Sequence, residues 1–312
     1  MTLSCEPGTK TGQPAWGMLF GMRFANVAGR GSLVVADAVI DIAEASQGEL
    51  PADPMDLLRV WPDLVAAATM LAVSKWRPLD ETRLESPVPC PGSIFGLVAN
   101  YPPATRPEPP VPMVFGKFPG SVCGPCDDIK LPVAETLPMR AEWTVLEAEL
   151  AVVMGRGGRR IQARDSLEAV AGFTVAQDIT ERFHEFGPRG SSVGTMQYAS
   201  LKAMGKSLDT FCPLGPVLVT LDEFSAPDDL ALECKLNGVV VQEASTAELL
   251  FGVSELIEFL SAFVTLRPGD VILTGTPTPI GGQLPRLTPG DVVETSIAGI
   301  GTLRNRCVAE IA

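Results

Sequence analysis

Short apolar segments separated by proline, glycine and aspartate make up most of the chain after residue 90. These segments are SIFGLVANY, MVFGKF, TVLEAELAVVMG, AGFTVAQDI, GPVLVTLDEF, LALECKLNGVVVQE, DVILTGTP and DVVETSIAGIGTLRNRCVAEI. Because they are rich in β-branched residues and bounded by turn formers, we expect a series of strands. One convincing helix is expected at residues 246–263, where leucine, valine and isoleucine recur at helical spacing. The pattern predicts a β-rich α+β fold.

The first 90 residues have a different organisation. Residues 18–45 alternate in hydrophobicity and predict two or three strands, whereas residues 54–73 have near-helical spacing interrupted by Pro62 and predict one or two short helices. A segment rich in proline and charge follows at residues 78–91, which is typical of a connector. We therefore expect a small N-terminal β-rich domain with its connector at residues 1–90 and a second, larger domain at residues 91–312.

The net charge of the chain limits the classes of partner that it is expected to bind. The chain has 24 Lys+Arg against 37 Asp+Glu, a net charge of -13, without a block of basic residues. Nucleic acids and anionic membranes are therefore not expected as partners. No segment reaches the ~18 apolar residues of a membrane span, and the N-terminus lacks the order of a signal peptide, so a cytoplasmic location is expected.

The cysteines are 7 in number and scattered, which favours reduced thiols over a disulfide framework. Cys123 and Cys126 have the spacing of a redox CxxC motif. The segment after them is typical of a turn entering an extended strand, whereas a redox motif opens a helix. A structural zinc site would need a second pair of ligands at a fixed spacing, which the sequence does not supply.

Acidic residues interrupt two of the apolar segments. Glu147 and Glu149 are two residues apart, so both carboxylates should leave the same face of a strand. Asp178 ends the apolar segment 173–178. Buried carboxylates of this kind require a cation, and three oxygen ligands favour Mg²⁺, Mn²⁺ or Ca²⁺ over zinc. The alternative for the two glutamates is an edge strand whose polar face is wet.

Several motifs together resemble the fumarylacetoacetate hydrolase superfamily. They are GKFP (116–119), LEAELAVVMG (146–155), AGFTVAQD (171–178), GKSLDTF (205–211), LRPGDVILTGTP (266–277) and GIGTLRN (299–305). The resemblance covers nearly the whole chain from about residue 18. It implies a mixed β-sandwich roll, usually a homodimer, with Mg²⁺ or Mn²⁺ held by Glu147, Glu149 and Asp178.

The resemblance also implies residues that contact an anionic substrate. The lysine of the GKS motif falls on Lys206, and the arginine after the aspartate falls on Arg182; both are expected at the substrate carboxylate or a developing oxyanion. Thr276 matches a substrate-contacting threonine, and Lys117 in the GKFP motif is placed with the substrate-binding residues. A surface position is the alternative for Lys206.

One family feature is missing. Hydrolases of this family carry a histidine, and a glutamate three residues later, after an Asn-Tyr pair. Here these positions hold Ala104 and Pro107, with Glu108 one residue away. The one histidine of the chain, His184, stands beside Glu185 after the metal aspartate. It is either a relocated acid/base pair with Glu185 or a loop histidine without a catalytic role.

The chemistry expected from this combination is enolate chemistry on a 2-oxo or 1,3-dicarbonyl carboxylic acid. Decarboxylation and isomerisation or tautomerisation can proceed by metal polarisation with modest proton transfer, whereas hydrolysis requires an activated water. We therefore favour a decarboxylase or an isomerase/tautomerase. The alternatives are a C–C hydrolase with a non-standard base, and an inactive homologue that binds metal and ligand.

Overall fold

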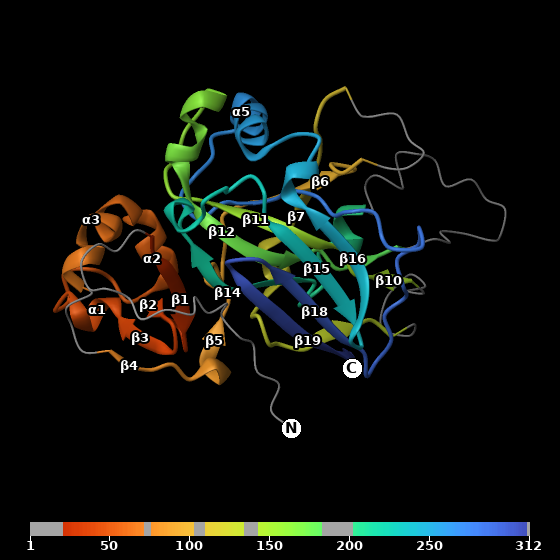
Figure 1. The fold of residues 1–312 in the computed structure, drawn as a ribbon, viewed down its shortest axis with the longest axis horizontal. Helices are drawn as coiled ribbons and strands as arrows, with labels where there is room; N and C mark the ends of the chain where they lie inside the picture. The colour runs from red at the N-terminus through yellow and green to blue at the C-terminus, as the bar shows by residue number, and fades with distance from the viewer. Residues whose placement is uncertain (1–20, 72–75, 103–109, 134–142, 183–201, 311–312) are drawn as a thin grey trace.

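A large mixed sheet forms the centre of the molecule (Figure 1). The computed structural model describes residues 21–71, 76–102, 110–133, 143–182 and 202–310. Within these residues the sheet has 12 strands, ten of them in the order β4-β3-β2-β1-β14-β12-β11-β17-β6-β7, with β5 on β1 and β8 on β14. Their bounds are β1 (Arg23–Val27), β2 (Arg30–Val35), β3 (Ala38–Asp41), β4 (Arg77–Pro78), β5 (Leu84–Glu85), β6 (Ile94–Val98), β7 (Met113–Lys117), β8 (Val122–Cys123), β11 (Ala148–Met154), β12 (Val170–Gln177), β14 (Cys212–Val219) and β17 (Val271–Leu273).

The remaining strands form two smaller sheets. One has five strands in the order β16 (Val239–Ser245), β15 (Ala231–Leu236), β18 (Val292–Ile297), β19 (Gly301–Ala309) and β9 (Ile129–Leu131). The other pairs β10 (Thr144–Val145) with β13 (Thr180–Glu181). The hairpin between β15 and β16 turns at Asn237-Gly238, where both residues have positive φ as such a tight turn requires. The strand-rich α+β fold predicted from the sequence is confirmed.

Helices are few among the described residues. They are α1 (Ile42–Ala45), α2 (Pro54–Arg59), α3 (Trp61–Leu71) and α5 (Val253–Phe263), with helical residues also at 202–205 and 3-10 turns at Glu81–Arg83, Pro119–Ser121, Ala163–Ala169, Leu221–Glu223 and Thr246–Glu248. Helix α2 begins where the sequence supplies a cap, because the Asp53 side chain accepts hydrogen bonds from two backbone amides and Pro54 occupies the first turn. In this part of the chain no helix has the length and apolar character needed to span a membrane.

The central strands of the large sheet, β11, β12 and β14, are buried on both faces. On β11, Leu150, Val152 and Met154 belong to a core shared with α5 and the five-stranded sheet. The alternate residues Ala151 and Val153 belong to a second core shared with α2 and α3. Because β11 is covered on both sides, it is apolar except for Glu149 near its start, and the polar ends of β11 and its neighbours are the places where a site can form.

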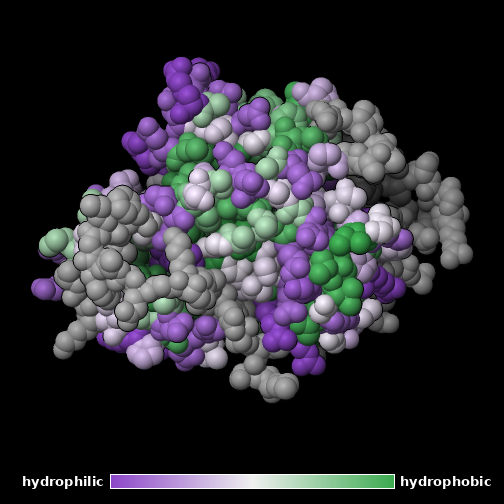
Figure 2. Space-filling model, in the orientation of Figure 1, coloured by the Kyte–Doolittle hydropathy of each residue, from purple (hydrophilic) through white to green (hydrophobic). Residues whose placement is uncertain are grey.

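The N-terminal strands continue this sheet through the pairing of β1 with β14. Helices α1 to α3 lie with β1 to β4 at one end of the molecule (Figure 1). The boundary predicted near residue 90 stays a prediction. On the face drawn in Figure 2, hydrophobic side chains gather in places among hydrophilic ones, one group lying over the region of β16. Val239, at the start of this edge strand, is 65% exposed.

Candidate metal and substrate site

Two neighbouring strands of the large sheet, β11 and β12, bring the predicted carboxylates together. In the antiparallel pair β11 and β12, Ala148 faces Gln177, so Glu147 and Asp178 lie side by side just outside the pairing. The backbone N–H of Asp178 donates to the carbonyl of Glu147 at 2.8 Å. Glu149 follows on β11, and ligand oxygens of Glu147, Glu149 and Asp178 all lie within 4.8 Å of one another. The cluster predicted from the sequence therefore exists in space.

Glu147 differs from its prediction in one respect. The sequence predicts one strand from Thr144 to Met154, but β10 ends at Val145 and β11 begins at Ala148. Glu147 lies in the break, where its backbone N–H donates to the side chain of Gln177 at 3.0 Å. The strand is interrupted because β10 pairs with β13 in a separate sheet, while β11 stays in the large one.

Glu149 is the carboxylate that most needs a cation. The residue is 1% exposed, and its carboxylate accepts a hydrogen bond from the backbone N–H of Gly275 at 2.5 Å. Burial raises the pKa of Glu149 well above its usual range, and the negative charge of Asp178 adds to this effect. A hard divalent cation between these oxygens would remove both penalties. The donor set therefore fits a metal such as Mg²⁺ or Mn²⁺.

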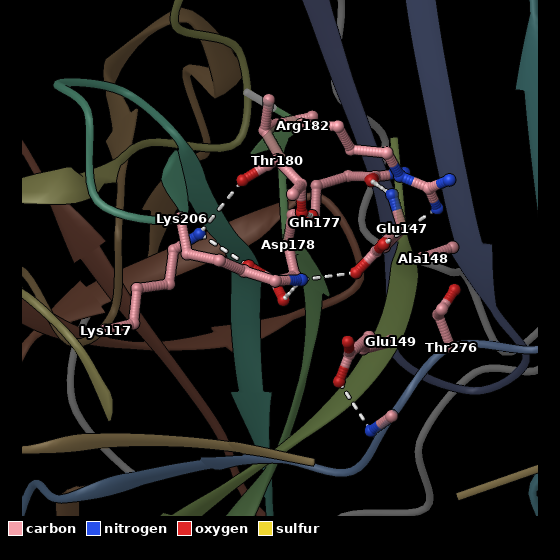
Figure 3. A network of polar contacts seen from close by, with 12 residues as sticks. Lys117, Glu147, Ala148, Glu149, Gln177, Asp178, Thr180, Arg182, Lys206 and Thr276 are labelled. Atoms are coloured by element: carbon pink, nitrogen blue, oxygen red, sulfur yellow. Dashed lines mark hydrogen bonds and ion pairs between the residues drawn. The ribbon is translucent and has the colours of Figure 1, made fainter. Parts of the chain in front are cut away.

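Two buried lysines surround Asp178 (Figure 3). Lys117 Nζ donates to Asp178 Oδ1 at 2.6 Å and to the carbonyl of Ile179 at 3.3 Å. Lys206 Nζ donates to the carboxylates of both Glu147 and Asp178. Burial opposes the ionisation of Asp178, but the charges of Lys117 and Lys206 outweigh it and lower the pKa of this carboxyl. Asp178 is thus an anion at neutral pH.

The pKa of Lys206 is shifted in the opposite direction. Burial disfavours its ammonium form, but the charges of Asp178 and Glu147 outweigh burial and raise the pKa of Lys206 above its ordinary value. Lys206 is therefore a fixed positive charge within the cluster, and its contact with substrate stays a prediction. Lys117, which the sequence assigns to substrate binding, has a completely buried side chain against Asp178.

Arg182 and Thr276 lie at the rim of the cluster. Arg182 extends a guanidinium nitrogen to 3.8 Å from Glu147 Oε1, and its side chain is 38% exposed. Thr276 lies on the opposite side of the carboxylates from Lys117 (Figure 3). The Thr276 hydroxyl accepts a hydrogen bond from Gln242 Nε2 at 2.7 Å. Both residues are half-exposed, so their polar atoms can contact a small molecule that binds over the cluster.

Several residues missed by the sequence analysis support the cluster. Gln242 accepts from the backbone N–H of Ala148 and donates to Thr276 and to the carbonyl of Pro277, so it joins β11 to the loop after β17. Gln177 orients Glu147 and donates to the Thr295 hydroxyl. The signal for Gln177 was available, because the residue stands directly before Asp178 in an apolar strand.

Asn100 fixes the loop after β6. Strands β6 and β17 are parallel, so the chain leaves both at the same end of the sheet. The Asn100 side chain donates to the carbonyls of Thr274 and Phe251 and accepts from the Phe251 N–H. A side chain at Gly275 is excluded, because its φ is +99° and a Cβ would lie 2.8 Å from Asn100 Cβ. The close approach of Asn100 to Gly275 therefore holds the Gly275 N–H that donates to Glu149.

Tyr101, the next residue, is 4% exposed, and its hydroxyl has no hydrogen-bond partner among the described residues. Burial, with a contribution from the Glu149 charge, raises the pKa of this hydroxyl.

Other predicted residues lie outside the described part of the chain. These are Ala104, Pro107 and Glu108 in residues 103–109, and His184 and Glu185 in residues 183–201.

The CxxC motif is not a dithiol pair in a redox site. Cys123 is a free, buried cysteine, and burial raises the pKa of its thiol. The chain after Cys126 enters β9 through a turn in which Asp127 accepts from the Gly124 N–H, as predicted. The expectation that all cysteines are reduced is wrong for Cys126, which is disulfide-bonded.

Comparison with known proteins gives a consistent result. Residues 95–308 match the family model described as fumarylacetoacetate (FAA) hydrolase, C-terminal. Over 250 residues, 78% of this chain and 74% of the relative, the sequence is 39% identical to the mitochondrial oxaloacetate tautomerase FAHD2A of Bos taurus.

Two solved structures are also similar. The 5-carboxymethyl-2-hydroxymuconate delta-isomerase of Mycobacterium smegmatis is 30% identical with a TM-score of 0.70, covering 93% of this chain and 100% of that one. The maleylpyruvate hydrolase of Sphingobium sp. SYK-6, in complex with manganese(II) and pyruvate, is 27% identical with a TM-score of 0.74 and the same coverage.

Proposed function

We propose that this chain, which belongs to the fumarylacetoacetate hydrolase family, is a divalent-metal-dependent enzyme that isomerises or tautomerises a 2-oxo or 1,3-dicarbonyl carboxylic acid. The observation that carries this proposal is the convergence of Glu147, Glu149 and Asp178 from different parts of the chain, with buried Glu149 in need of a cation. Oxaloacetate, the substrate in the name of the Bos taurus relative, is the first candidate.

Mg²⁺ or Mn²⁺ is the proposed metal, because carboxylate oxygens are the ligands that these ions prefer. A similar structure contains manganese(II) together with pyruvate, a 2-oxo acid. When bound, the ion supplies Lewis-acid polarisation of a carbonyl oxygen.

The residues of the chain have separate proposed tasks. Lys206 holds a positive charge at the cluster and stabilises the negative charge that develops on the substrate oxygen when a proton leaves the neighbouring carbon. Arg182 and Thr276 at the rim bind and orient the substrate. Lys117 is buried against Asp178, so we propose that its effect on the substrate passes through that carboxylate. His184 and Glu185 are proposed as the acid/base pair that moves the proton.

Isomerase or lyase chemistry is favoured over hydrolysis because of the sequence after Tyr101. Ala104 and Pro107 replace the histidine and glutamate of the family dyad, and we propose that the usual water-activating base is missing. Tautomerisation moves a proton between carbon and oxygen and needs no positioned water. Decarboxylation of a 2-oxo acid remains within the same proposal, because it also passes through an enolate.

The experiment is a direct assay on the purified chain. Fresh oxaloacetate enol is mixed with the protein and Mg²⁺ or Mn²⁺, and loss of enol absorbance is followed, while pyruvate release reports decarboxylation. We expect acceleration that a chelator removes and that Glu149→Gln lacks. A rate equal to that of Glu149→Gln in the presence of metal would contradict the proposal.

A C–C hydrolase is the second candidate, favoured by the similarity to a maleylpyruvate hydrolase. An acylpyruvate added in the same assay distinguishes it, since efficient cleavage would show that another group activates water. Metal binding without turnover of any of these acids would indicate the inactive homologue. The homodimer and the cytoplasmic location stay predictions; light scattering measures the first.

A further inference from the structure

Lys202 is a half-buried cation close to the cluster. Its Nζ lies 5.4 Å from the centroid of the Phe115 ring, and Lys206 Nζ lies 4.8 Å from the same centroid. Both ammonium groups therefore lie close to the same aromatic ring, and Lys202 and Lys206 are neighbours in space. Among the described residues no carboxylate reaches ion-pair distance of Lys202. The Lys202 ammonium has thus lost part of its hydration without gaining an anionic partner.

The charges around Lys202 increase this imbalance. Burial lowers the pKa of Lys202, and the positive charge of Lys206 lowers it further, whereas Glu147 and Asp178 act in the opposite direction. Those two carboxylates already form ion pairs with Lys206, and Asp178 also pairs with Lys117. Arg182 contributes a further like charge. Holding Lys202 here therefore costs free energy when no anion is bound.

The charge balance of the whole site indicates the class of anion. Among the residues that the structure describes, the three carboxylates of the cluster lie near four cations, namely Lys117, Lys202, Lys206 and Arg182. A divalent metal ion increases the positive surplus. A 2-oxo acid with one carboxylate offsets one positive charge, whereas a 2-oxo diacid offsets two. The chelating end of either acid belongs at the carboxylate cluster, which leaves the second carboxylate of a diacid for the cations at the rim.

We propose that Lys202, together with Arg182, binds the distal carboxylate of a 2-oxo diacid and thereby selects diacids over monoacids. This inference rests on the proposed function, which assigns the 2-oxo end of the substrate to the cluster. Phe115 is half-buried, lies close to both lysines and provides an apolar surface for the carbon chain that joins the two ends of the substrate.

Two ligands that differ only at the distal end test the proposal. Oxaloacetate carries a carboxylate where 2-oxobutanoate carries a methyl group. Calorimetry on the full chain with Mg²⁺ measures the dissociation constant of each acid for the wild type and for Lys202→Met, which keeps an unbranched apolar side chain but removes the charge. We expect oxaloacetate to bind about tenfold more weakly to the variant, the typical contribution of a hydrogen bond to a charged group. Binding of 2-oxobutanoate should change less than about twofold.

Two further variants complete the design. Lys202→Arg should recover most of the oxaloacetate affinity, because it restores the charge. Lys235→Met removes a lysine of the five-stranded sheet that pairs with Glu233, and it should leave both constants unchanged. Equal losses for both acids in Lys202→Met, or no loss for oxaloacetate, would overturn the inference.

Binding is measured independently of turnover, so the inference and the proposed function can fail separately. A wild type that prefers oxaloacetate over 2-oxobutanoate through Lys202, yet leaves the enol untouched, would support the subsite and contradict the enzymatic proposal. A wild type that accelerates tautomerisation but binds the two acids equally would contradict the subsite alone.

Discussion

Replacing Lys117 by methionine tests how the buried charges hold each other. The side chains of Lys117 and Asp178 are both 0% exposed, and their Nζ and Oδ1 atoms are 2.6 Å apart. Removing one partner of a buried ion pair leaves the other charge uncompensated and typically costs about 3–5 kcal/mol. Asp178 keeps its second partner, Lys206, so we expect Lys117→Met to lower the free energy of unfolding by about 3 kcal/mol, the lower end of this range.

Urea unfolding with a chelator present measures this effect. The midpoint should fall while the slope stays the same, because the surface exposed on unfolding hardly changes. Lys235→Met, which removes a partly exposed ion pair, serves as the control and should leave the midpoint in place. The double variant Lys117→Met/Asp178→Asn should be more stable than Lys117→Met, since no uncompensated charge remains. A loss below about 1 kcal/mol, or a double variant less stable than the single one, would refute the assignment.

Three further predictions concern metal binding and pH. Glu149→Gln should abolish Mg²⁺ binding in calorimetry while the circular dichroism spectrum is unchanged; an unaltered affinity would mean that the metal site lies elsewhere. Gly275→Ala should weaken Mg²⁺ binding about tenfold or more, because a Cβ 2.8 Å from Asn100 Cβ displaces the amide that binds Glu149. At Asp291, partial burial opposes ionisation, but hydrogen bonds from Asn237 and Thr288 outweigh it and lower the pKa. The stability lost in Asp291→Asn should therefore be seen above pH ~4 and should vanish as the pH falls further, as thermal unfolding at several pH values would show.

Local sequence patterns could not predict the order of the strands in the large sheet. Alternation and turn residues located most of the strands, but the single segment expected at residues 230–243 is a hairpin of β15 and β16 that turns at Asn237-Gly238. The pairing of β1 with β14, however, joins residues almost 200 positions apart and depends on tertiary packing. The predicted helix at residues 246–263 is a 3-10 turn followed by α5, because the N–H groups of Leu250 and Phe251 bond to Asn100 instead of continuing a helix.

The cluster itself was predicted more completely than its surroundings. Glu147, Glu149 and Asp178 were found because acids inside apolar strands conflict with burial unless a cation is present. Lys117 was known as a motif residue, but its contact with Asp178 joins β7 to the end of β12 and leaves no local signal. Lys202 lies four residues before Lys206, a spacing that places both on one side of a helix, and that spacing was available from the sequence.

Asn100 fixes the backbone beside the carboxylate cluster just before the segment that follows Tyr101. Its bonds to Phe251 and Thr274 hold the chain in register up to the start of the proline-rich segment that follows Tyr101. Insertions, deletions or exchanges beyond that point need not move Glu149 or the Gly275 amide. A grafting experiment can test this, since replacing residues 103–109 alone should leave the Mg²⁺ affinity unchanged in calorimetry.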